Sequence, residues 1–433
     1  MGPGAMKLRA SLATLSRRQK AKAGPSEVEA RTRPSPAAVL FINTTEFFGP
    51  VMQVHSRIIK RLDPQDYRVI VATNRRGDSH DQFRKIDGID IRLYNLGVSF
   101  NSYSKSPLGR GAALISNLES IGNIPRLIGL IWKERVKVIH SASAPRMVLL
   151  GAALALLTPA KLVVHVHEKP SSLRGVKRVL VKWASQRAKA VITVSKFIAR
   201  DMEILGVDSK KIWPVLNTVD AERFNPHASG EAIRREFGVK PDELLVVVVG
   251  RIVKEKGQWD LIEAMAMVKE RCPKAKALLV GWSPPGDGYL EELRSYRDTL
   301  GLADTVIFGK PRTDIPEVTA AADVVAVPST KSDPCPLVVL EAMASGKPVV
   351  GTITGGIPEM LVEGTGLLAP PREPAALAGA LITLLSDASL RRRLGEAARR
   401  RVERDFYEGR LAEQVSEVYR AVVGSEARQA VVK

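Results

Sequence analysis

The stretch VVAVPSTKSDPCPLVVLEAMASGKPVV, residues 324–350, shows most directly how this chain folds. A short apolar run, Val324–Val327, leads into a polar loop with two prolines, and an apolar helical segment, Leu337–Ala344, follows. The helical segment stops at Gly346, and a second apolar run begins at Pro348. Short apolar runs separated by a helix are typical of parallel strands that are buried on both faces of a sheet. The stretch therefore predicts a strand, helix, strand unit in an α/β domain.

The same alternation extends along the chain in two series, with a break around residues 217–226. The strands expected in the first series are Ala38–Ile42, Arg68–Ala72, Val136–His140, Lys161–His165 and Ala190–Val194. Those expected in the second series are Leu244–Val249, Ala277–Val280, Thr305–Phe308, Val324–Val327 and Pro348–Gly351. Helical stretches such as Met52–Leu62 and Trp259–Arg271 lie between them. This pattern predicts two doubly wound, Rossmann-like α/β domains that face each other across a cleft and bind a ligand there.

We place the domain boundaries from composition and from the break. Residues 1–36 are rich in Ala, Ser, Arg and Pro and are expected to form a disordered basic arm, although this composition also suits an organellar transit peptide. Residues 37–220 and 221–408 are the two expected domains. The remaining segment, 409–433, is expected to be a helix that packs back on the first domain.

Composition excludes several classes of protein. The chain has 433 residues, of which 45% are hydrophobic and 26% are charged, as in a soluble protein of two domains. Two cysteines, Cys272 and Cys335, are too few for a disulfide framework or a thiolate zinc cluster and fit a reducing compartment. The longest apolar run, Met147–Thr158, is too short to span a bilayer, and basic residues interrupt the first apolar stretch, which argues against a secretory signal. We therefore expect a cytoplasmic protein.

The net charge of +19 is unevenly distributed. Residues 1–36 carry 8 basic and 2 acidic residues, residues 37–230 carry 29 and 15, and residues 231–433 carry 28 and 29. The basicity therefore belongs to the arm and the first domain, while the second domain is nearly neutral. Such an asymmetry indicates an anionic partner of the first half: nucleic acid, a membrane surface or an acidic substrate.

Two basic residues follow the first strand of the second series, in the segment Gly250–Gly257. Arg251 leaves the carboxyl end of the strand, and Lys256 lies just before the next helix. Two cations beside the N–H groups of a helix form an anion site that suits a diphosphate. An ordinary basic loop is the alternative.

Two acids lie eight residues apart in the segment 324–350. Asp333 is in the polar loop, and Glu341 is in the helix. Because Pro334 and Pro336 prevent one continuous helix, the loop can fold Asp333 back over the helix start, so that both carboxylates face one polyhydroxylated ligand. In the alternative interpretation Asp333 caps the helix and Glu341 is solvated.

The chain resembles family 4 glycosyltransferases of the GT-B fold, the glycosyltransferase group 1 type, from Ala38 to about Phe406. The motifs described above occur in the order in which they occur in that family. The resemblance implies that Arg251 and Lys256 hold the diphosphate of a sugar nucleotide, that Glu341 binds the ribose and that Asp333 addresses the donor sugar. These four residues are the expected catalytic set. The full expected donor site is Gly250, Arg251, Lys256, Ser332, Asp333, Cys335, Pro336, Leu337, Val338 and Glu341. The expected acceptor or cleft residues, in the first domain, are Gly49, His167 and Glu168.

Two departures from the family pattern concern this site. The family more often has Glu where this chain has Asp333, which shortens the side chain by one methylene. The Gly-Gly turn after the first strand is reduced to Gly49-Pro50. Gly355, Gly356 and Glu359 match the turn that follows in the family.

The resemblance implies a retaining hexosyltransferase that uses a UDP- or GDP-linked donor and requires no cofactor or metal. No Asp-x-Asp pair occurs in the sequence, and His165 and His167 have no third ligand near them in the chain, so we expect no metal site. The absence of Gly-x-Gly-x-x-Gly after a strand argues against a dinucleotide-dependent oxidoreductase.

The acceptor is expected to be a glycan or a lipid-linked saccharide in cell-surface glycan assembly. The segment 174–189 combines basic residues with Leu180 and Trp183, which suits peripheral contact with an anionic membrane, for example the inner face of the plasma membrane. A helix packed on the sheet with a solvated basic face is the alternative. A soluble acceptor and a GT-B-like sugar-nucleotide epimerase or scaffold also remain open. Nucleic-acid binding is disfavoured, because no known nucleic-acid motif is present.

Overall fold

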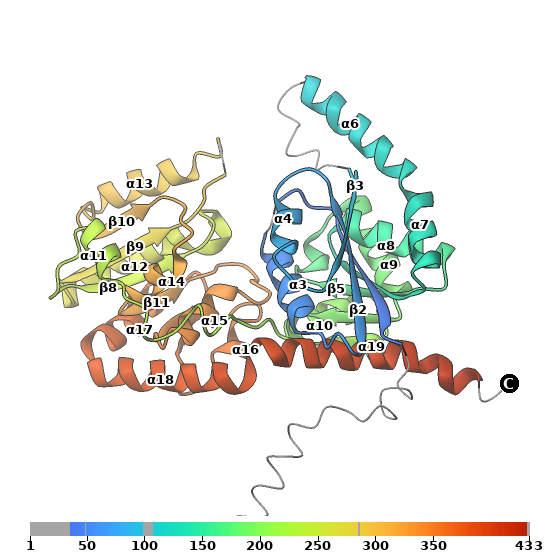
Figure 1. The fold of residues 1–433 in the computed structure, drawn as a ribbon. Helices are drawn as coiled ribbons and strands as arrows, with labels where there is room; N and C mark the ends of the chain where they lie inside the picture. The colour runs from blue at the N-terminus through green and yellow to red at the C-terminus, as the bar shows by residue number, and fades with distance from the viewer. Residues whose placement is uncertain (1–34, 48, 98–106, 285, 431–433) are drawn as a thin grey trace, which may run out of the picture.

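The computed structural model describes residues 35–47, 49–97, 107–284 and 286–430, which form two α/β domains side by side (Figure 1). Nearly all of the expected basic arm, residues 1–36, lies outside these described residues. The first domain contains a parallel sheet of seven strands. In sheet order the strands are β3 Asp90–Tyr94, β2 Tyr67–Asn74, β1 Ala37–Asn43, β4 Val136–Ala142, β5 Lys161–Val166, β6 Ala190–Thr193 and β7 Ile212–Pro214.

The second domain contains a parallel sheet of six strands. In sheet order they are β10 Val306–Gly309, β9 Ala275–Val280, β8 Leu244–Val249, β11 Val324–Val327, β12 Val349–Thr352 and β13 Leu367–Ala369. The order within this sheet matches that of β3 to β6 in the first sheet, and it is the order of doubly wound nucleotide-binding folds. The prediction of two Rossmann-like domains is confirmed.

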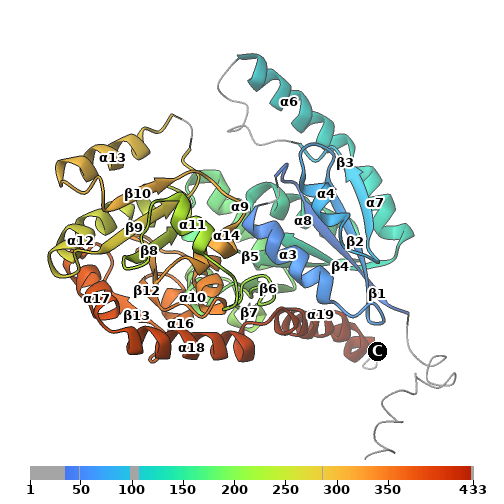
Figure 2. The same ribbon diagram turned by 60° about the vertical axis from the view of Figure 1, so that its left-hand side comes forward.

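Helices cover both faces of each sheet (Figures 1 and 2). Those of the first domain are α3 Pro50–Arg61, α4 Ser79–Phe83, α6 Pro107–Gly122, α7 Ile124–Lys133, α8 Pro145–Leu157, α9 Gly175–Arg187 and α10 Lys196–Ile204. Those that follow are α11 Glu231–Glu236, α12 Gln258–Arg271, α13 Tyr289–Thr299, α14 Ile315–Ala320, α15 Leu337–Ala344, α16 Ile357–Met360, α17 Pro374–Ser386, α18 Ala388–Asp405 and α19 Glu408–Ala430. Short 3-10 turns occur at η1 Pro170–Ser172, η2 Ser209–Lys211 and η3 Lys254–Lys256.

The strands read as continuous apolar runs because both of their faces are buried. In β1, Val39 and Phe41 pack in the cluster that includes α3 and α19, whereas Leu40 and Ile42 pack in the cluster on the opposite face. This second cluster continues through Val219 into the second domain. Apolar packing therefore joins the two domains and fixes the position of the loops between them.

The final helix, α19, belongs to the core of the first domain although it follows the second domain in sequence. It lies along α3, and its buried hydrophobic side chains are Leu411, Ala412, Val415, Val418, Tyr419 and Val422. Figures 1 and 2 show α18 and α19 running along the same side of the two domains. The chain thus crosses between the domains twice, near Val219 and near Tyr407, and these two residues pair with each other.

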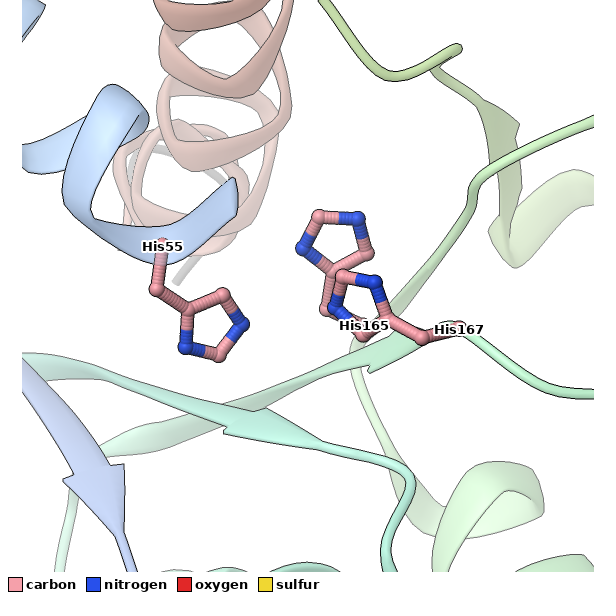
Figure 3. A group of neighbouring side chains, drawn as sticks. All are labelled: His55, His165 and His167. Atoms are coloured by element: carbon pink, nitrogen blue, oxygen red, sulfur yellow. The ribbon is translucent and has the colours of Figure 1, made fainter. Parts of the chain in front are cut away.

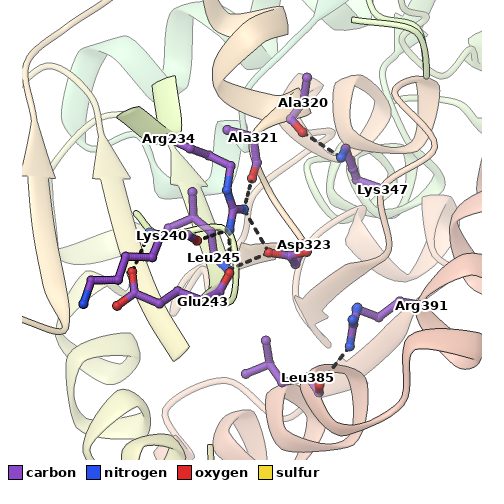
Figure 4. Close-up of polar contacts among 10 residues, drawn as sticks. All are labelled: Arg234, Lys240, Glu243, Leu245, Ala320, Ala321, Asp323, Lys347, Leu385 and Arg391. Atoms are coloured by element: carbon purple, nitrogen blue, oxygen red, sulfur yellow. Dashed lines mark hydrogen bonds and ion pairs between the residues drawn. The ribbon is translucent and has the colours of Figure 1, made fainter. Parts of the chain in front are cut away.

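A polar network ties the amino ends of the central strands of the second domain together (Figure 4). The carboxylate of Asp323, just before β11, accepts hydrogen bonds from Arg234 at 3.1 Å and from the main-chain N–H of Leu245 at 2.7 Å. Arg234 also donates to the carbonyl oxygens of Ala321 and Glu243. This end of the sheet is held by satisfied hydrogen bonds, and it lies opposite to the carboxyl ends where the basic and acidic motifs are found.

The apolar segment predicted to be a core helix is α8, whose buried residues include Met147, Val148 and Leu154. Among the residues that the structure describes, no helix combines the length and apolar character needed to cross a membrane.

Candidate active site

The two motifs of the second domain lie at the carboxyl ends of neighbouring strands. One loop leaves β8 and reaches α12 through η3, and the other leaves β11 and reaches α15. The loops touch at Gly257, which has a φ of +71° and where a Cβ atom would stand 1.8 Å from the carbonyl oxygen of Pro328. Glycine is therefore required at this position, because any side chain would push the two loops apart.

Hydrogen bonds and ion pairs join the two loops. The N–H of Thr330 donates to the carbonyl of Glu255 at 2.9 Å, and Lys331 pairs with the carboxylate of Glu255 at 3.1 Å. Lys256 donates to the carboxylate of Asp333. The segments that the sequence separates by more than seventy residues thus form one surface.

The two predicted cations have different surroundings. Arg251 is exposed, and its guanidinium makes no ion pair with any residue that the structure describes. Lys256 lies deeper, with a quarter of its side chain exposed, and is paired with Asp333, of which 12% is exposed. Ser329 donates a further hydrogen bond to the Asp333 carboxylate at 3.2 Å. One cation is therefore available to an anionic ligand at once, and the other is held by an acid.

The interpretation of Asp333 as a helix cap is wrong. Helix α15 begins after Pro336, and no side chain caps its first N–H groups. The carboxylate of Asp333 instead points to Lys256, while its carbonyl oxygen accepts the N–H of Gly356 at 2.8 Å. Gly355 has a φ of +59° and packs so closely on the Asp333 main chain that a Cβ would lie 2.0 Å from its oxygen. The glycine turn thus holds the main chain of Asp333, and the uncapped α15 begins four residues later with N–H groups that favour an anion.

Glu341, on α15, is not the solvated residue of the alternative interpretation. It is half-buried, and burial raises the pKa of its carboxyl above the ordinary value, while the guanidinium groups of Arg57 and Arg223 oppose the rise. The carboxylate accepts no hydrogen bond from any of the described residues, so both of its oxygens remain available to a ligand hydroxyl.

Arg57 is a charged neighbour of this site that the sequence analysis did not find. It lies on α3 of the first domain, donates to the carbonyl of Thr218 in the interdomain segment, and pairs with Glu408 at 3.7 Å. Its signal in the sequence is a lone basic residue among the apolar residues of a buried helix face, such as Ile58. Through Arg57, the first domain contributes positive charge close to Glu341.

Two polar contacts set the orientation of the domains. The carboxylate of Glu359, on α16, accepts the N–H groups of Lys196 and Phe197 at 2.8 and 2.7 Å, at the start of α10 in the first domain. Asn217 donates to the carbonyl of Cys335 at 3.1 Å. Acid at a helix N-terminus is favourable, so Glu359 acts as a cap supplied by the opposite domain.

Not all of the remaining expected donor residues have side chains at the surface of the site. Ser332, Leu337 and Val338 are half-buried along the loop and the first turn of α15, whereas Cys335 and Pro336 are buried. The Cys335 thiol faces the sulfur of Met360 at 3.7 Å, and burial raises its pKa to about 12. The side chain of Cys335 therefore packs in the core, beneath the surface formed by its neighbours.

The expected acceptor residues lie on the first domain. Gly49 precedes α3, and a Cβ there would meet no described atom within 4 Å, so the position does not require glycine. Glu168 is exposed, directly after the half-buried His167 at the end of β5.

The expectation that His165 and His167 have no third histidine near them is wrong in three dimensions. Helix α3 brings His55 against both, with ring centroids 5.6 Å from His165 and 5.4 Å from His167 (Figure 3). Burial lowers the pKa of His55 to about 3 and holds the pKa of the other two well below the ordinary value. The rings are therefore neutral at physiological pH. Sequence distance concealed this cluster, because more than a hundred residues separate α3 from β5.

Comparison with known proteins agrees with this architecture. The family model for glycosyl transferases group 1 matches residues 229–401, and that for glycosyltransferase family 4 matches residues 54–223. A D-inositol 3-phosphate glycosyltransferase of Corynebacterium urealyticum is 35% identical over 59% of this chain, but the match spans only 61% of that protein. A GDP-mannose-dependent alpha-(1-6)-phosphatidylinositol monomannoside mannosyltransferase of Mycolicibacterium smegmatis is 31% identical over 63% of this chain and 74% of its own length.

A solved structure extends the likeness over both domains. The crystal structure of Anabaena HepE in complex with UDP-glucose matches 89% of this chain and 99% of its own, with a TM-score of 0.73 and 25% identity. Together with the two family matches and the strand orders described above, these relatives show that the chain belongs to glycosyltransferase family 4 and has the GT-B fold.

Proposed function

We propose that this protein transfers a hexose from a nucleotide diphosphate donor to a hydroxyl acceptor. The observation that carries the proposal is the junction of two loops at the carboxyl ends of β8 and β11, which pairs Lys256 with Asp333, leaves Arg251 exposed on the same loop as Lys256, and leads into the uncapped helix α15. Names of relatives support a sugar-nucleotide donor: the mannosyltransferase is GDP-mannose-dependent, and HepE was solved with UDP-glucose.

Breaking a sugar–phosphate bond builds negative charge on the leaving diphosphate. Arg251 is free to bind it, and Lys256 lies on the same surface. When a diphosphate takes over Lys256, Asp333 loses its partner and becomes available to accept hydrogen bonds from the hydroxyls of the donor sugar. Glu341, whose oxygens are unengaged, would accept the ribose hydroxyls. Such preorganised charges supply the stabilisation that commonly dominates catalysis.

We propose further that the reaction retains the anomeric configuration and needs no metal at the diphosphate. Two side-chain cations and the N–H groups at the start of α15 supply positive charge at the place where a metal would otherwise act. Same-face attack with the leaving phosphate as base fits this arrangement, because the carboxylate of Asp333 is directed at Lys256. Asp333 then positions the sugar and is not the nucleophile.

For the acceptor, we propose a lipid-linked saccharide that the first domain binds at a membrane surface. The basic residues Lys177, Arg178 and Lys182 on α9 are exposed, and so are Val176 and Val179 beside them. The mannosyltransferase relative carries a phosphatidylinositol monomannoside in its name, which supports this choice.

Trp183 does not fit the membrane contact that was predicted for the segment 174–189. Trp183 is half-buried against the core, and the guanidinium of Arg187 lies over its ring at 4.6 Å. It therefore helps hold α9 on the domain. A soluble acceptor is the second candidate, and the name of the inositol phosphate glycosyltransferase relative favours it.

The donor proposal is tested by incubating the full chain with a panel of UDP- and GDP-linked hexoses and measuring release of the nucleoside diphosphate, with and without EDTA. We expect turnover of one donor that largely persists in EDTA and is lost in Arg251→Ala. If no donor is hydrolysed or transferred, or if the sugar nucleotide is epimerised instead, the transferase proposal fails. Complete loss in EDTA with rescue by a divalent ion would overturn its metal-independent part.

The membrane proposal is tested by co-sedimentation with acidic and neutral vesicles across a salt series. Each basic residue near an anionic surface contributes about 1 kcal/mol, so replacing Lys177, Arg178 and Lys182 by Gln should weaken binding on the order of a hundredfold. The matched control replaces three exposed lysines of the second domain: Lys269, Lys274 and Lys310. Equal binding to both kinds of vesicle at low salt, or equal loss in the control, would favour a soluble acceptor.

A further inference from the structure

The first domain is hollowed at the amino ends of its strands, where the proposed donor chemistry has no part. The larger hollow, of about 900 Å³, is bounded by the starts of β1, β2 and β4 and by the second half of α19. A smaller hollow of about 300 Å³ shares Arg135, Lys137 and Val423 with it and extends to the start of β5. Both volumes suit a small molecule. Because the strands are parallel, this end of the sheet lies opposite to the carboxyl ends.

The lining of the larger hollow carries more positive than negative charge. Three of its exposed cations form no ion pair with any residue that the structure describes: Arg135, Lys137 and Arg420. Arg68 also lines the hollow, but it pairs with Glu134 at 2.9 Å, so these two charges balance each other. Asp66 is the remaining acid of the lining. Three unpaired cations beside one acid favour an anionic occupant.

Arg135 has a main-chain conformation that does not favour a side chain. It lies between α7 and β4 with a φ of +50°, in the left-handed region where glycine commonly ends a helix. A structural reason for a cation here would be its interaction with the carboxyl end of α7, but Lys133 in the last turn already supplies one. The arginine at this strained position is therefore better explained by a ligand than by folding.

The walls beside these cations are largely apolar. Ala38 and Tyr67 line the larger hollow, and the hydroxyl of Tyr67 is engaged elsewhere, because it donates to the carbonyl oxygen of Ser416 at 3.1 Å. Ile131 and Trp132 line the smaller hollow, and 59% of Trp132 is exposed. An indole that remains in water contributes little to folding, so the apolar surface around it suits the apolar part of a ligand.

We propose that these joined hollows bind a phosphate monoester that carries an apolar group. The dianionic phosphate matches the three cations, and guanidinium groups such as that of Arg135 bind phosphate oxygens through paired N–H donors. The apolar group then lies along Tyr67 and Trp132. The chain's own segment 1–36, which ends at this hollow, is not a suitable occupant, because it carries 8 basic and 2 acidic residues. The inference does not rest on the proposed function, because its test measures binding alone.

The experiment titrates the full chain with naphthyl phosphate by calorimetry, and with naphthol and inorganic phosphate as partial ligands. We expect one saturable site that binds naphthyl phosphate at least tenfold more tightly than either partial ligand. Arg135→Gly, Lys137→Gln and Arg420→Gln should each weaken this binding about tenfold. Arg135→Gly should also melt at the same temperature as the unchanged chain or higher, because glycine adopts the positive φ without strain. A merely structural arginine would not give this combination.

Lys133→Gln is the matched control, because Lys133 is exposed on the last turn of α7 and lines neither hollow, so binding should not change. Arg251→Ala should also leave the binding of naphthyl phosphate unchanged, which separates this site from the proposed diphosphate site.

The source of the ligand is distinguished with vesicles. Displacement of bound naphthyl phosphate by phosphatidylcholine vesicles that contain phosphatidic acid, but not by pure phosphatidylcholine, would assign the natural ligand to a lipid headgroup. Lack of displacement would assign it to a soluble phosphate monoester. Absence of saturable binding, or equal affinity for naphthol, would overturn the proposal. Unchanged affinity in a folded Arg135→Gly variant together with a loss in Arg251→Ala would overturn it as well and assign the probe to the diphosphate site.

Discussion

Replacement of Lys256 by alanine should separate two roles that the structure gives to one side chain. Lys256 pairs with Asp333 across the two loops, and in the proposed reaction it also binds the donor diphosphate. The variant therefore removes a cation from the leaving group and at the same time leaves a largely buried carboxylate without its main partner.

The two effects differ in size. Loss of one preorganised charged group at a developing negative charge lowers turnover on the order of a hundredfold. The ion pair, with exposures of 25% and 12% for its side chains, is intermediate between exposed pairs, which contribute about 0–1 kcal/mol, and buried pairs, whose disruption costs about 3–5 kcal/mol. We expect a loss of about 1–2 kcal/mol in the free energy of unfolding, which lowers the melting temperature by only about 1–2 °C, because the entropy of unfolding of a 433-residue chain is large.

A double-mutant cycle with Asp333→Ala distinguishes the roles. Stability should partly recover in the double variant, because no lone carboxylate remains, whereas turnover should stay low. Lys331→Ala is the matched control, because Lys331 joins the same two loops through Glu255 with both side chains more than half exposed. It should change neither stability nor turnover appreciably.

Two outcomes would refute this reasoning. Full turnover of Lys256→Ala at saturating donor would remove the lysine from the diphosphate site. Recovery of turnover together with stability in the double variant would show that Lys256 acts only by restraining Asp333.

Three further predictions concern neighbouring residues. Because burial raises the pKa of Glu341, its ionised form destabilises the folded chain at neutral pH, and this penalty is relieved as pH falls through the raised pKa. Glu341→Gln should therefore raise the melting temperature at pH 7 and weaken the binding of UDP or GDP, measured by calorimetry, about tenfold. Unchanged nucleotide affinity would contradict the assignment of Glu341 to the ribose. Burial raises the pKa of Cys335 to about 12, so a thiol reagent should modify only the half-exposed Cys272 in the native chain and both cysteines after denaturation. Rapid modification of both cysteines in the native chain would contradict the buried position of Cys335. Glu359→Gln should accelerate hydrogen exchange of the first amides of α10, because the charged cap of this helix is lost. Unchanged exchange rates would show that the contact between Glu359 and α10 is not maintained in solution.

The fold was largely predictable because most strands are buried on both faces. Runs such as Leu244–Val249 carry that signal without interruption. The strands that the sequence pattern did not predict lack such a continuous apolar run. β3 has no fully buried residue, and β7 and β13 have three residues each. Their pairing is imposed by the neighbouring strand, so their own sequence gives no indication of it.

The candidate site was predictable only where its residues follow strands of the same domain. Arg251, Lys256 and Asp333 could be placed from spacing, because the carboxyl ends of parallel strands meet at one edge. His55 and Arg57 could not. They are two residues apart on α3 and therefore point in directions about 200° apart, one toward β4 and β5 and the other toward the interdomain segment. Their partners are determined by the packing of α3, which local sequence does not reveal.

The distribution of charge favours a partner of the first domain that is distinct from the donor. The second domain holds the proposed diphosphate site, yet residues 231–433 are nearly neutral, and Lys256 is balanced locally by Asp333. Arg57 of the first domain lies near Glu341, but the excess of basic residues in 37–230 is too large for that one contact with the donor site to explain. On α9, Lys177, Arg178 and Lys182 form no ion pair with any described residue, although the chain neutralises other surface cations in this way, as at Lys274. Unpaired cations on one exposed helix face are best satisfied by an external anionic surface, and the vesicle experiment measures that contact directly.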